Sequence, residues 1–322
     1  MAQALYEPLS GEEELLERLE ERLGRVHARQ RLGMEREYED KFSGRVNFFN
    51  PDKWYSVHSF FTCALKLTGL YGLGLRNAGR VEVRHNHIDF PDLPSEFDSF
   101  TILHLSDLHV EMSAPAMRRL AELVSTLEYD ICVLTGDYRG KAFGAFDEAL
   151  RGMAGVRSRL GEAVYGVLGN HDTVRMLPEL EAMGIRMLLN ESETFVRGKQ
   201  RLHLAGVDDA HQYMAANLEK ASAGIPGGEF SILLSHTPEI YKQAAYAGFR
   251  LFLSGHTHGG QICLPGSVPV TLSCDLPRRF GAGRWSYDSM KGYTSVGVGS
   301  SVIPVRFNCS PEVTLHHLRL TR

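Results

Sequence analysis

Five short apolar runs in the chain each end in polar residues, and this repeated pattern constrains the fold more than any other feature of the sequence. The runs cover residues 101–107, 131–137, 164–170, 230–236 and 250–256. Runs of this length and composition are typical of strands buried on both faces of a sheet. Helical patterns fill several of the intervals between them, near residues 114–128, 176–184, 212–222 and 238–247. This alternation predicts an α/β fold with helices over the sheet faces.

The residues at the five run ends are of the types that bind metal ions. They are Asp107, His109, Asp137, Asn170, His171, Asp172, His236, His256 and His258. In open α/β sheets, binding sites form outside the carboxyl ends of the strands. A single histidine at a strand end is more often an ordinary hydrogen-bonded residue than a ligand. Five strand ends that all carry carboxylate, imidazole or amide groups predict a shared site instead.

Composition excludes several classes of protein. Hydrophobic residues make up 43% of the chain, charged residues 23%, and the formal net charge is −4. These values argue against general disorder, a polytopic membrane protein and a strongly basic nucleic-acid binder. The 5 cysteines form no CxxC pair, and the first ten residues lack the features of a signal peptide. We therefore expect a cytoplasmic chain with reduced thiols.

The first 98 residues differ in character from the rest, and we expect an N-terminal extension over 1–98 and a main domain over 99–322. Leu15, Leu19, Leu23 and Val26 recur at helical spacing and predict a helix that packs on the main domain or on a second copy of the chain. Residues 1–40 hold 6 Arg and 11 Asp or Glu, whereas residues 41–84 hold 7 Lys or Arg and 2 Asp or Glu.

The basic half of the extension contains an apolar stretch over residues 57–75. It is interrupted by Gly69, Gly72, Gly74 and Lys66 and is too short to span a bilayer. Two alternatives stay open. The stretch is an amphipathic element that contacts a membrane surface through residues 57–84, at the inner face of the membrane, or it packs as a cover on the main domain. After Gly266 the helical signal fades, and residues 293–299 and 313–320 alternate as antiparallel strands do.

The order of the polar elements resembles that of the calcineurin-like metallophosphoesterases. These elements are Asp-x-His, Gly-Asp, Gly-Asn-His-Asp, a lone His and Gly-His-x-His, over residues 107–258. The segments 254–266 and 303–307 resemble a bacterial branch of small phosphodiesterases, which is also similar to a UDP-2,3-diacylglucosamine hydrolase of lipid A biosynthesis. The resemblance covers about residues 100–320. It implies a β-sandwich of two mixed sheets flanked by helices, and we expect a helical N-terminal extension beside it.

The resemblance also implies a binuclear centre. The first ion would be bound by Asp107, His109 and His258, the second by Asn170, His236 and His256, and both by Asp137 as a bridge. Ligands of these types without thiolate suit Mn, Fe or Zn, of which Mn²⁺ is favoured. A neutral Asn170 leaves the centre with a surplus of positive charge that attracts a phosphate.

Catalytic and substrate roles follow from the same resemblance or from position alone. His171 is expected to face the substrate as a general acid or charge stabiliser, and Asp172 to orient its imidazole. Arg139 is a candidate phosphate contact. Asp208, Asp209 and His211 are expected to border the cleft or to cap a loop.

These features together predict a phosphohydrolase that cleaves a phosphodiester or pyrophosphate by attack of a metal-bridged hydroxide. The apolar stretch and its basic flank favour a membrane-associated, nucleotide-linked lipid substrate such as UDP-2,3-diacylglucosamine. One alternative is a soluble phosphodiesterase for cyclic nucleotides or nucleic-acid ends, although the chain lacks a long basic stripe for nucleic acid. Another is a non-catalytic protein-binding scaffold, which the presence of His171 and all seven expected ligands disfavours.

Overall fold

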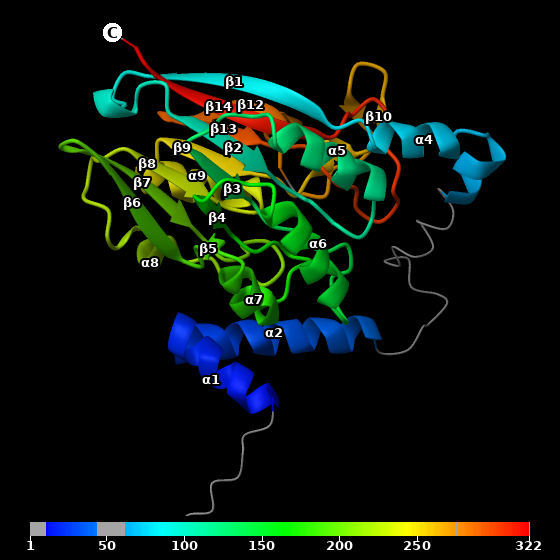
Figure 1. Cartoon of the computed structure of the whole chain (residues 1–322), viewed down its shortest axis with the longest axis horizontal. Helices are drawn as coiled ribbons and strands as arrows, with labels where there is room; N and C mark the ends of the chain where they lie inside the picture. Colours follow the sequence, from blue (N-terminus) through cyan, green and yellow to red (C-terminus); the bar gives the residue numbers. More distant parts are fainter. Residues whose placement is uncertain (1–10, 44–61, 275, 322) are drawn as a thin grey trace, which may run out of the picture.

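The computed structural model describes residues 11–43, 62–274 and 276–321. In this part of the chain two six-stranded mixed sheets lie face to face (Figure 1). The first sheet has the order β1 (Glu82–Phe90), β14 (Glu312–Leu320), β2 (Thr101–Leu105), β3 (Ile131–Leu134), β4 (Val164–Gly166) and β5 (Arg186–Met187). The second has the order β12 (Gly283–Tyr287), β13 (Met290–Thr294), β9 (Leu251–Ser254), β8 (Ser231–Leu234), β7 (Gln200–Gly206) and β6 (Glu191–Arg197).

Helices cover the outer faces of both sheets, so the apolar core forms three layers. Side chains such as Ile102, Val133 and Leu253 fill the space between the sheets. The first sheet is covered by α5 (Ala114–Val124), α6 (Asp147–Arg157) and α7 (Leu177–Ala182). The second is covered by α8 (Leu218–Ser222) and α9 (Tyr241–Tyr246). The expected sandwich of two mixed sheets flanked by helices is confirmed.

The five apolar runs contain the strands β2, β3, β4, β8 and β9, and each strand ends shortly before its ligand-type residues. Two other expectations need correction. β14 is antiparallel to β2 but parallel to β1, and β13 is antiparallel to β12 but parallel to β9. The helix expected near 212–222 is confined to α8, because the preceding loop is held by hydrogen bonds from its backbone to Asp209.

Strand β1 lies inside the range that we expected to form the N-terminal extension. It pairs with β14 from Glu82 to Phe90 and forms the edge of the first sheet. Ile88 and Phe90 of this strand are buried between the sheets. The sandwich therefore begins about Glu82, before the expected boundary at residue 98.

Two helices, α1 (Gly11–Leu23) and α2 (Arg25–Ser43), lie along α7 at one side of the sandwich (Figure 1). Leu19 and Leu23 join the core layer beside the first sheet, so this helical stripe packs on the main domain. Gly24 separates the two helices with a φ of 88°, a backbone conformation that favours glycine. This break shifts the register, which leaves Val26 exposed rather than on the packed stripe.

The described part of the apolar stretch, from residue 62, includes α4 (Tyr71–Ala78). Residues 57–61 lie outside the described residues. Gly74 of α4 packs closely against Val305 and Phe307, while Leu67 and Leu70 are exposed. Among the described residues, no helix is both long enough and apolar enough to cross a membrane.

Candidate metal centre

The strand ends bring the expected ligand residues to one edge of the sandwich with an unusual backbone. Five of the seven have φ angles between 38° and 73°, in a region that residues with side chains rarely adopt. They are Asp107, His109, Asp137, His256 and His258. Such conformations cluster where the surrounding structure holds functional groups in place. The shared strain indicates that these loops are shaped for the side chains that they present.

Two glycines allow the loops after β3 and β4 to approach each other. Gly136 has a φ of 89°, and a side chain there would place Cβ 2.5 Å from the backbone nitrogen of Gly169. At Gly169 a Cβ would lie 2.2 Å from Oδ1 of Asp137. The two loops can pack this closely only because Gly136 and Gly169 carry no side chains.

The ligand-type side chains form two groups that share Asp137. In the first, Nε2 of His109 lies 3.2 Å from Nε2 of His258, which is 3.5 Å from Oδ1 of Asp107. Oδ2 of Asp137 lies 3.7 Å from Nε2 of His109. The same oxygen lies 3.4 Å from Nε2 of His236, in the second group. Asp137 therefore lies between the two groups, and all of these residues are buried.

The second group consists of His236, His256 and Asn170. Oδ1 of Asn170 lies 3.0 Å from Nε2 of His236 and 2.9 Å from Nδ1 of His256. The other ring nitrogens donate to backbone carbonyl oxygens, Nδ1 of His236 to Thr135 and Nε2 of His256 to Ser273. When the rings are neutral, the nitrogens that face inward carry lone pairs, and so does the amide oxygen.

The donor set fits divalent ions on these observations. Nδ1 of His109 likewise donates to the carbonyl oxygen of Arg139, which leaves Nε2 free to act as a ligand. Hydrogen bonds of this kind fix the tautomer of metal-binding histidines. Imidazole, carboxylate and amide groups without thiolate are ligands that suit Mn, Fe and Zn.

The pKa values of the buried groups also indicate that the centre favours a positive charge. Burial opposes ionisation of Asp137, yet the imidazoles of His236 and His171 hold its pKa well below the usual range. Burial would lower the pKa of His236, but Asp137 and Asp107 raise it to about 10. Burial raises the pKa of Asp107 to about 6 and lowers that of His109 to about 4. A bound cation would stabilise both buried carboxylates, and His109 is neutral and able to bind one.

His171 lies at the open side of the centre. Its Nδ1 donates to the carbonyl oxygen of Gly140 at 2.9 Å, and its Nε2 lies 4.0 Å from Oδ2 of Asp137. Its side chain is partly exposed, at 18%. The ring is therefore oriented by a backbone carbonyl and presents Nε2 toward both the centre and solvent.

Asp172 has a different task from the one expected, because the structure gives it no bond to the His171 ring. Its carboxylate accepts hydrogen bonds from the backbone N–H groups of Gly169, Asp137 and Tyr138, at 2.8, 2.8 and 2.9 Å. These groups belong to the loops after β3 and β4. Asp172 therefore joins the loops that present Asp137 and Asn170.

The four candidate substrate residues are not gathered at the centre. The guanidinium of Arg139 is buried and donates to the carbonyl oxygens of His171, Ala142 and Gly144. Asp209 accepts from backbone N–H groups of its own loop, as a capping residue does. Of the four, His211 is next to an expected ligand, with its ring 4.5 Å from that of His256, and its pKa is raised by a hydrogen bond to Glu239.

The fourth candidate, Asp208, contacts the N-terminal helices, a link that the sequence analysis missed. Its buried carboxylate lies 2.8 Å from Nε2 of His27 and 3.3 Å from Nε of Arg31. On the same helix, Glu35 accepts from Oγ1 of Thr173 at 2.5 Å and from the backbone of Val174 at 2.7 Å. The helical spacing of Arg31 and Glu35 was a signal for a shared face of the helix. It did not show which loop that face contacts.

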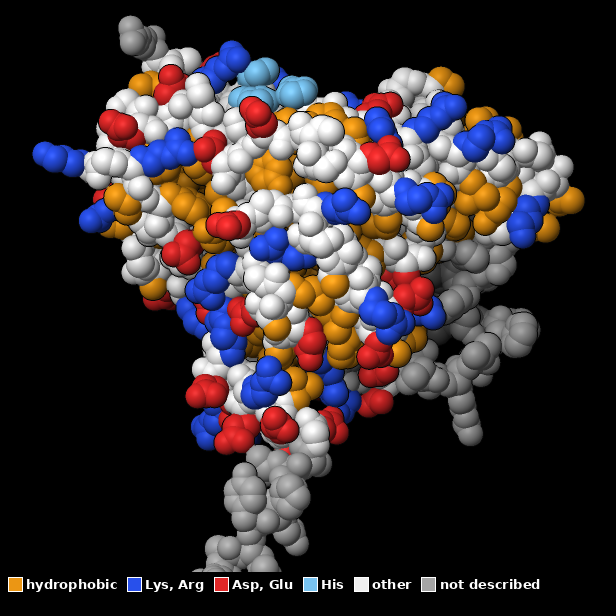
Figure 2. Space-filling view, viewed as in Figure 1, with side chains coloured by type: hydrophobic (Ala, Val, Ile, Leu, Met, Phe, Trp, Pro, Cys, Tyr) orange, Lys and Arg blue, Asp and Glu red, His pale blue; other side chains and the backbone are white. Residues whose placement is uncertain are grey.

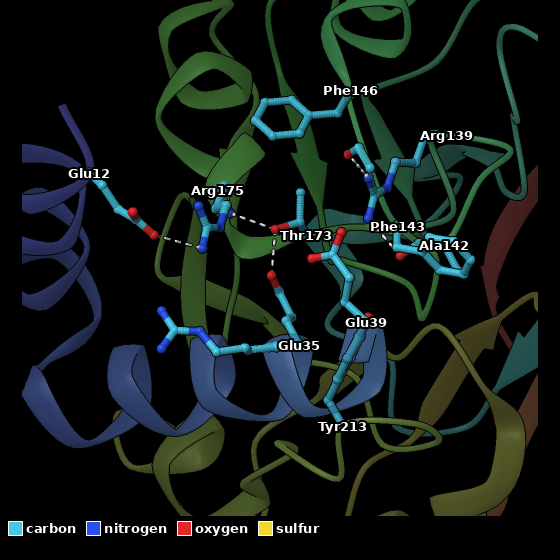
Figure 3. A pocket seen from close by; sticks show the side chains of 12 residues that line it. Glu12, Glu35, Glu39, Arg139, Ala142, Phe143, Phe146, Thr173, Arg175 and Tyr213 are labelled. Atoms are coloured by element: carbon cyan, nitrogen blue, oxygen red, sulfur yellow. Dashed lines mark hydrogen bonds and ion pairs between the residues drawn. The ribbon is translucent and has the colours of Figure 1, made fainter. Parts of the chain in front are cut away.

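A cavity of about 280 Å³ lies between α2 and the loops next to the centre (Figure 3). Its wall includes Phe143 and Phe146, and Thr173 lies between them and α2. Charged residues of both signs also line it: Glu12, Glu35, Arg36, Glu39, Arg139 and Arg175. Figure 3 shows Arg175 directed toward Glu12, 3.3 Å away, and Glu35 directed toward Thr173.

Comparisons with known proteins agree with this site. A family model described as calcineurin-like phosphoesterase matches residues 100–260. The chain is 30% identical over 254 residues to the uncharacterized metallophosphoesterase YkoQ of Bacillus subtilis, covering 76% of this chain and 92% of YkoQ. It is 31% identical over 270 residues to the bovine transmembrane protein with metallophosphoesterase domain, covering 77% of this chain and 59% of that protein. It is 28% identical over 251 residues to the phosphodiesterase YaeI of Escherichia coli, covering 73% and 87%.

Proposed function

Because the chain belongs to the calcineurin-like phosphoesterase family, we propose that it is a binuclear hydrolase that cleaves a phosphodiester or pyrophosphate bond. At the coarser level it is a metal-dependent phosphoester hydrolase. The observation that carries the finer proposal is the central place of Asp137, whose Oδ2 lies between His109 in one group and His236 in the other. A carboxylate in that position would hold two divalent ions together as a shared ligand.

In this proposal seven residues hold the metals: Asp107, His109, Asp137, Asn170, His236, His256 and His258. Two bound divalent ions lower the pKa of a shared water and stabilise negative charge on a phosphate. The chain contributes two carboxylates to the ligand set, and the ligand at Asn170 is a neutral amide. The centre therefore keeps a net positive charge that attracts an anionic substrate.

His171 is the catalytic side chain of this proposal. Nδ1 donates to Gly140, so Nε2 is the atom that holds or accepts a proton at the open side of the centre. From there it donates to the leaving oxygen or stabilises charge that develops on the phosphate. Asp172 supports the reaction by positioning the loops of Asp137 and Asn170.

We propose that the cavity beside α2 binds one of the two groups that the scissile phosphate links. At about 280 Å³ it is slightly smaller than typical ligand pockets, and Phe143 and Phe146 offer apolar faces. A sugar or a nucleobase fits these dimensions. The two acyl chains of UDP-2,3-diacylglucosamine exceed this volume, so with that substrate the chains would lie outside the cavity.

The test compares hydrolysis of a generic phosphodiester, a phosphomonoester and a UDP-linked acylated sugar by the full chain with Mn²⁺. We expect the diester or the UDP-linked compound to exceed the monoester. We also expect Asp137→Asn to lower the rate by more than ~100-fold, beyond the usual effect of residues behind the ligands. Asp147→Asn, an exposed change at the start of α6, is the matched control.

Three outcomes would contradict the proposal. Full activity of Asp137→Asn would remove the bridging role. Absence of hydrolysis of all three compounds by metal-loaded protein would instead favour the non-catalytic scaffold. A monoester preference would assign the site to phosphomonoesters and remove the diester proposal.

We also propose that the surface around α4 contacts an anionic membrane. Leu67 is 83% exposed and Leu70 44%. Figure 2 shows apolar and basic side chains interleaved on the part of the surface over α4. Leu264 and Val268, in the hairpin of β10 (Cys263–Leu264) and β11 (Val268–Pro269), are exposed as well. Phe307 contacts both Gly74 of α4 and Cys263 of this hairpin, so the two elements are neighbours.

Basic residues adjacent to these apolar side chains favour anionic lipid. Lys66, Arg76 and Arg80 are close to the exposed leucines along the chain. Sedimentation with vesicles of phosphatidylglycerol should carry the protein down, and vesicles of phosphatidylcholine should carry less. Leu67→Ser combined with Leu70→Ser should reduce binding, whereas Val196→Ser, on β6 and also exposed, should not. Equal binding of all three proteins would show that the surface around α4 is not the contact. If the wild-type protein sediments with neither kind of vesicle, the membrane contact is contradicted and the soluble phosphodiesterase is favoured.

A further inference from the structure

A continuous chain of hydrogen bonds runs through the buried interior of the first sheet and ends on Asp107. Oγ of Ser106 donates to Oδ2 of Asp107 at 2.6 Å, and Oγ1 of Thr135 donates to Ser106 at 2.7 Å. Nε2 of His104 lies 2.8 Å from Thr135, and Nδ1 of His104 lies 3.2 Å from Nε2 of His316. These residues lie on or directly after β2, β3 and β14.

The chain of bonds continues from His316 to β1. Nδ2 of Asn86 lies 2.8 Å from Nδ1 of His316. The side chains of Asn86, His316, His104, Thr135 and Ser106 are all at most 2% exposed. Buried polar groups need hydrogen-bond partners, and the side-chain polar atoms of these residues have them, with one exception. The exception is Oδ1 of Asn86, which has no hydrogen-bond partner in the described residues.

The direction of every proton in this chain follows from Asp107. The hydroxyl of Ser106 has a single proton, and it donates that proton to Oδ2 of Asp107. Oγ of Ser106 must then accept from Thr135, and Oγ1 of Thr135 must accept from His104. His104 is therefore protonated at Nε2.

Neutrality of the two imidazoles completes the assignment. Burial lowers the pKa of His104 to about 3 and that of His316 well below its usual value, so each ring has one proton. Since His104 has its proton on Nε2, its Nδ1 accepts from Nε2 of His316. Nδ1 of His316 then accepts from Nδ2 of Asn86. The amide oxygen of Asn86 has no role in this arrangement, which agrees with its lack of a partner in the described residues. The opposite direction would leave the contact between Thr135 and Ser106 without a proton.

We propose that His104 and His316 are positioning residues for the metal centre, because they hold the Thr135 and Ser106 hydroxyls in the direction that orients Asp107. This proposal rests on the proposed metal-binding role of Asp107. The Ser106 hydroxyl fixes Oδ2, and the backbone N–H of His256 donates to both oxygens of the carboxylate, at 3.1 Å to Oδ1 and 3.0 Å to Oδ2. These contacts set the carboxylate plane and leave Oδ1 directed toward His258, 3.5 Å away. The imidazoles act on the centre through two hydroxyls and touch neither substrate nor metal.

The first test uses the full chain without added metal. The ¹H–¹⁵N spectrum of the side-chain imidazoles reports which ring nitrogen is protonated. We expect both His104 and His316 to be protonated at Nε2, with His104→Gln and His316→Gln assigning the signals. A proton on Nδ1 of His104 would overturn the proposal, whatever the activity of the enzyme.

The second test measures binding of Mn²⁺ by calorimetry, together with kcat and KM. Thr135→Val keeps the shape of the side chain but removes the hydroxyl between His104 and Ser106. We expect Mn²⁺ affinity to fall ~10–100-fold, as it does when groups behind metal ligands are lost, and kcat to fall more than KM changes. Thr135→Ser retains a hydroxyl and should restore most of the affinity.

The matched control is Thr314→Val. Thr314 is a fully buried threonine on β14, paired in register with His104, and its hydroxyl lies outside the chain of bonds. It should leave Mn²⁺ affinity unchanged. An equal loss in both valine variants, or none in Thr135→Val, would overturn the positioning role. If wild-type protein binds no Mn²⁺ while the tautomers are as expected, the proposed metal centre fails and the positioning role, which depends on it, is overturned with it.

Discussion

Arg31 donates from Nη2 to the backbone carbonyl oxygen of Asp172 at 3.0 Å, which joins the second N-terminal helix to the loop of Asn170 and His171. The guanidinium is fully buried and lies 3.5 Å above the ring of Tyr213. It also pairs with Glu35 at 2.8 Å. The helix that the sequence set apart from the main domain therefore packs directly behind a loop of the candidate centre.

Replacing Arg31 should reduce the free energy of unfolding. Arg31→Met leaves the buried carboxylate of Asp208 with fewer cationic partners, which costs about 3–5 kcal/mol of unfolding free energy. Urea unfolding measures this loss. Arg29→Met, on the same helix as Arg31, removes an exposed pair with Glu20 of α1 and should cost less than about 1 kcal/mol. Similar losses in the two variants would contradict the buried role of Arg31.

His171→Ala should lower turnover and spare metal binding. The ring contributes Nε2 at the open side of the centre, and general acid catalysis is typically worth about 10²–10⁴-fold. We expect kcat on a generic phosphodiester to fall by that range, with Mn²⁺ stoichiometry unchanged by elemental analysis. A variant that loses a metal ion would show that His171 is a ligand instead.

Gly136→Ala should destabilise the protein more than Gly144→Ala. Both glycines have positive φ angles, 89° and 85°, so each alanine costs about 1–2 kcal/mol in backbone strain. Only Gly136 also faces a neighbour, the backbone of Gly169 at 2.5 Å, and overpacking adds about 1–3 kcal/mol. Equal shifts in the urea midpoint would show that the loops separate freely.

The contribution of Asp208 to stability should depend on pH. Burial raises its pKa, but Arg31 and His27 outweigh burial and hold the pKa below the usual value. A carboxyl with a depressed folded pKa stabilises the fold above its unfolded pKa of about 3.9, and the effect is lost as pH falls through the folded pKa. Asp208→Asn should therefore cost most near about pH 7 and progressively less below about pH 4. A difference that stays constant in urea unfolding over this range would contradict the assignment.

Much of the sandwich and of the candidate centre was predictable, because both depend on local pattern. A buried strand reads as an apolar run, and the residues after it fall at the same edge of the sheet wherever the run pairs. This pattern alone was enough to predict that Asp107 and Asp137 lie at the site. β1 was not recognised because it pairs with β14, in which each partner residue, such as Glu312 for Glu82, lies 230 positions further along the chain. No local pattern indicates a partner at that separation.

The roles of Asp172, Arg139 and Asp208 could not be predicted from position along the chain. Asp172 and Arg139 lie two residues after a ligand in sequence, whereas Asp208 follows strand β7 far from any ligand. All three use their hydrogen bonds on backbone groups or on an N-terminal helix. Which donor meets which acceptor depends on how loops far apart in the sequence approach one another.

By itself the sequence determined the layered α/β architecture, the identity of the ligand-type residues and the order in which they occur, since periodicity and residue chemistry are local properties. Only the tertiary structure decided that Asp137 lies between two groups of ligands. It also decided that Arg31 supports the loop of His171 and that His104 connects Asn86 with Asp107. These relationships are distances between residues on different strands and helices, and they exist only once the two sheets and the N-terminal helices have packed.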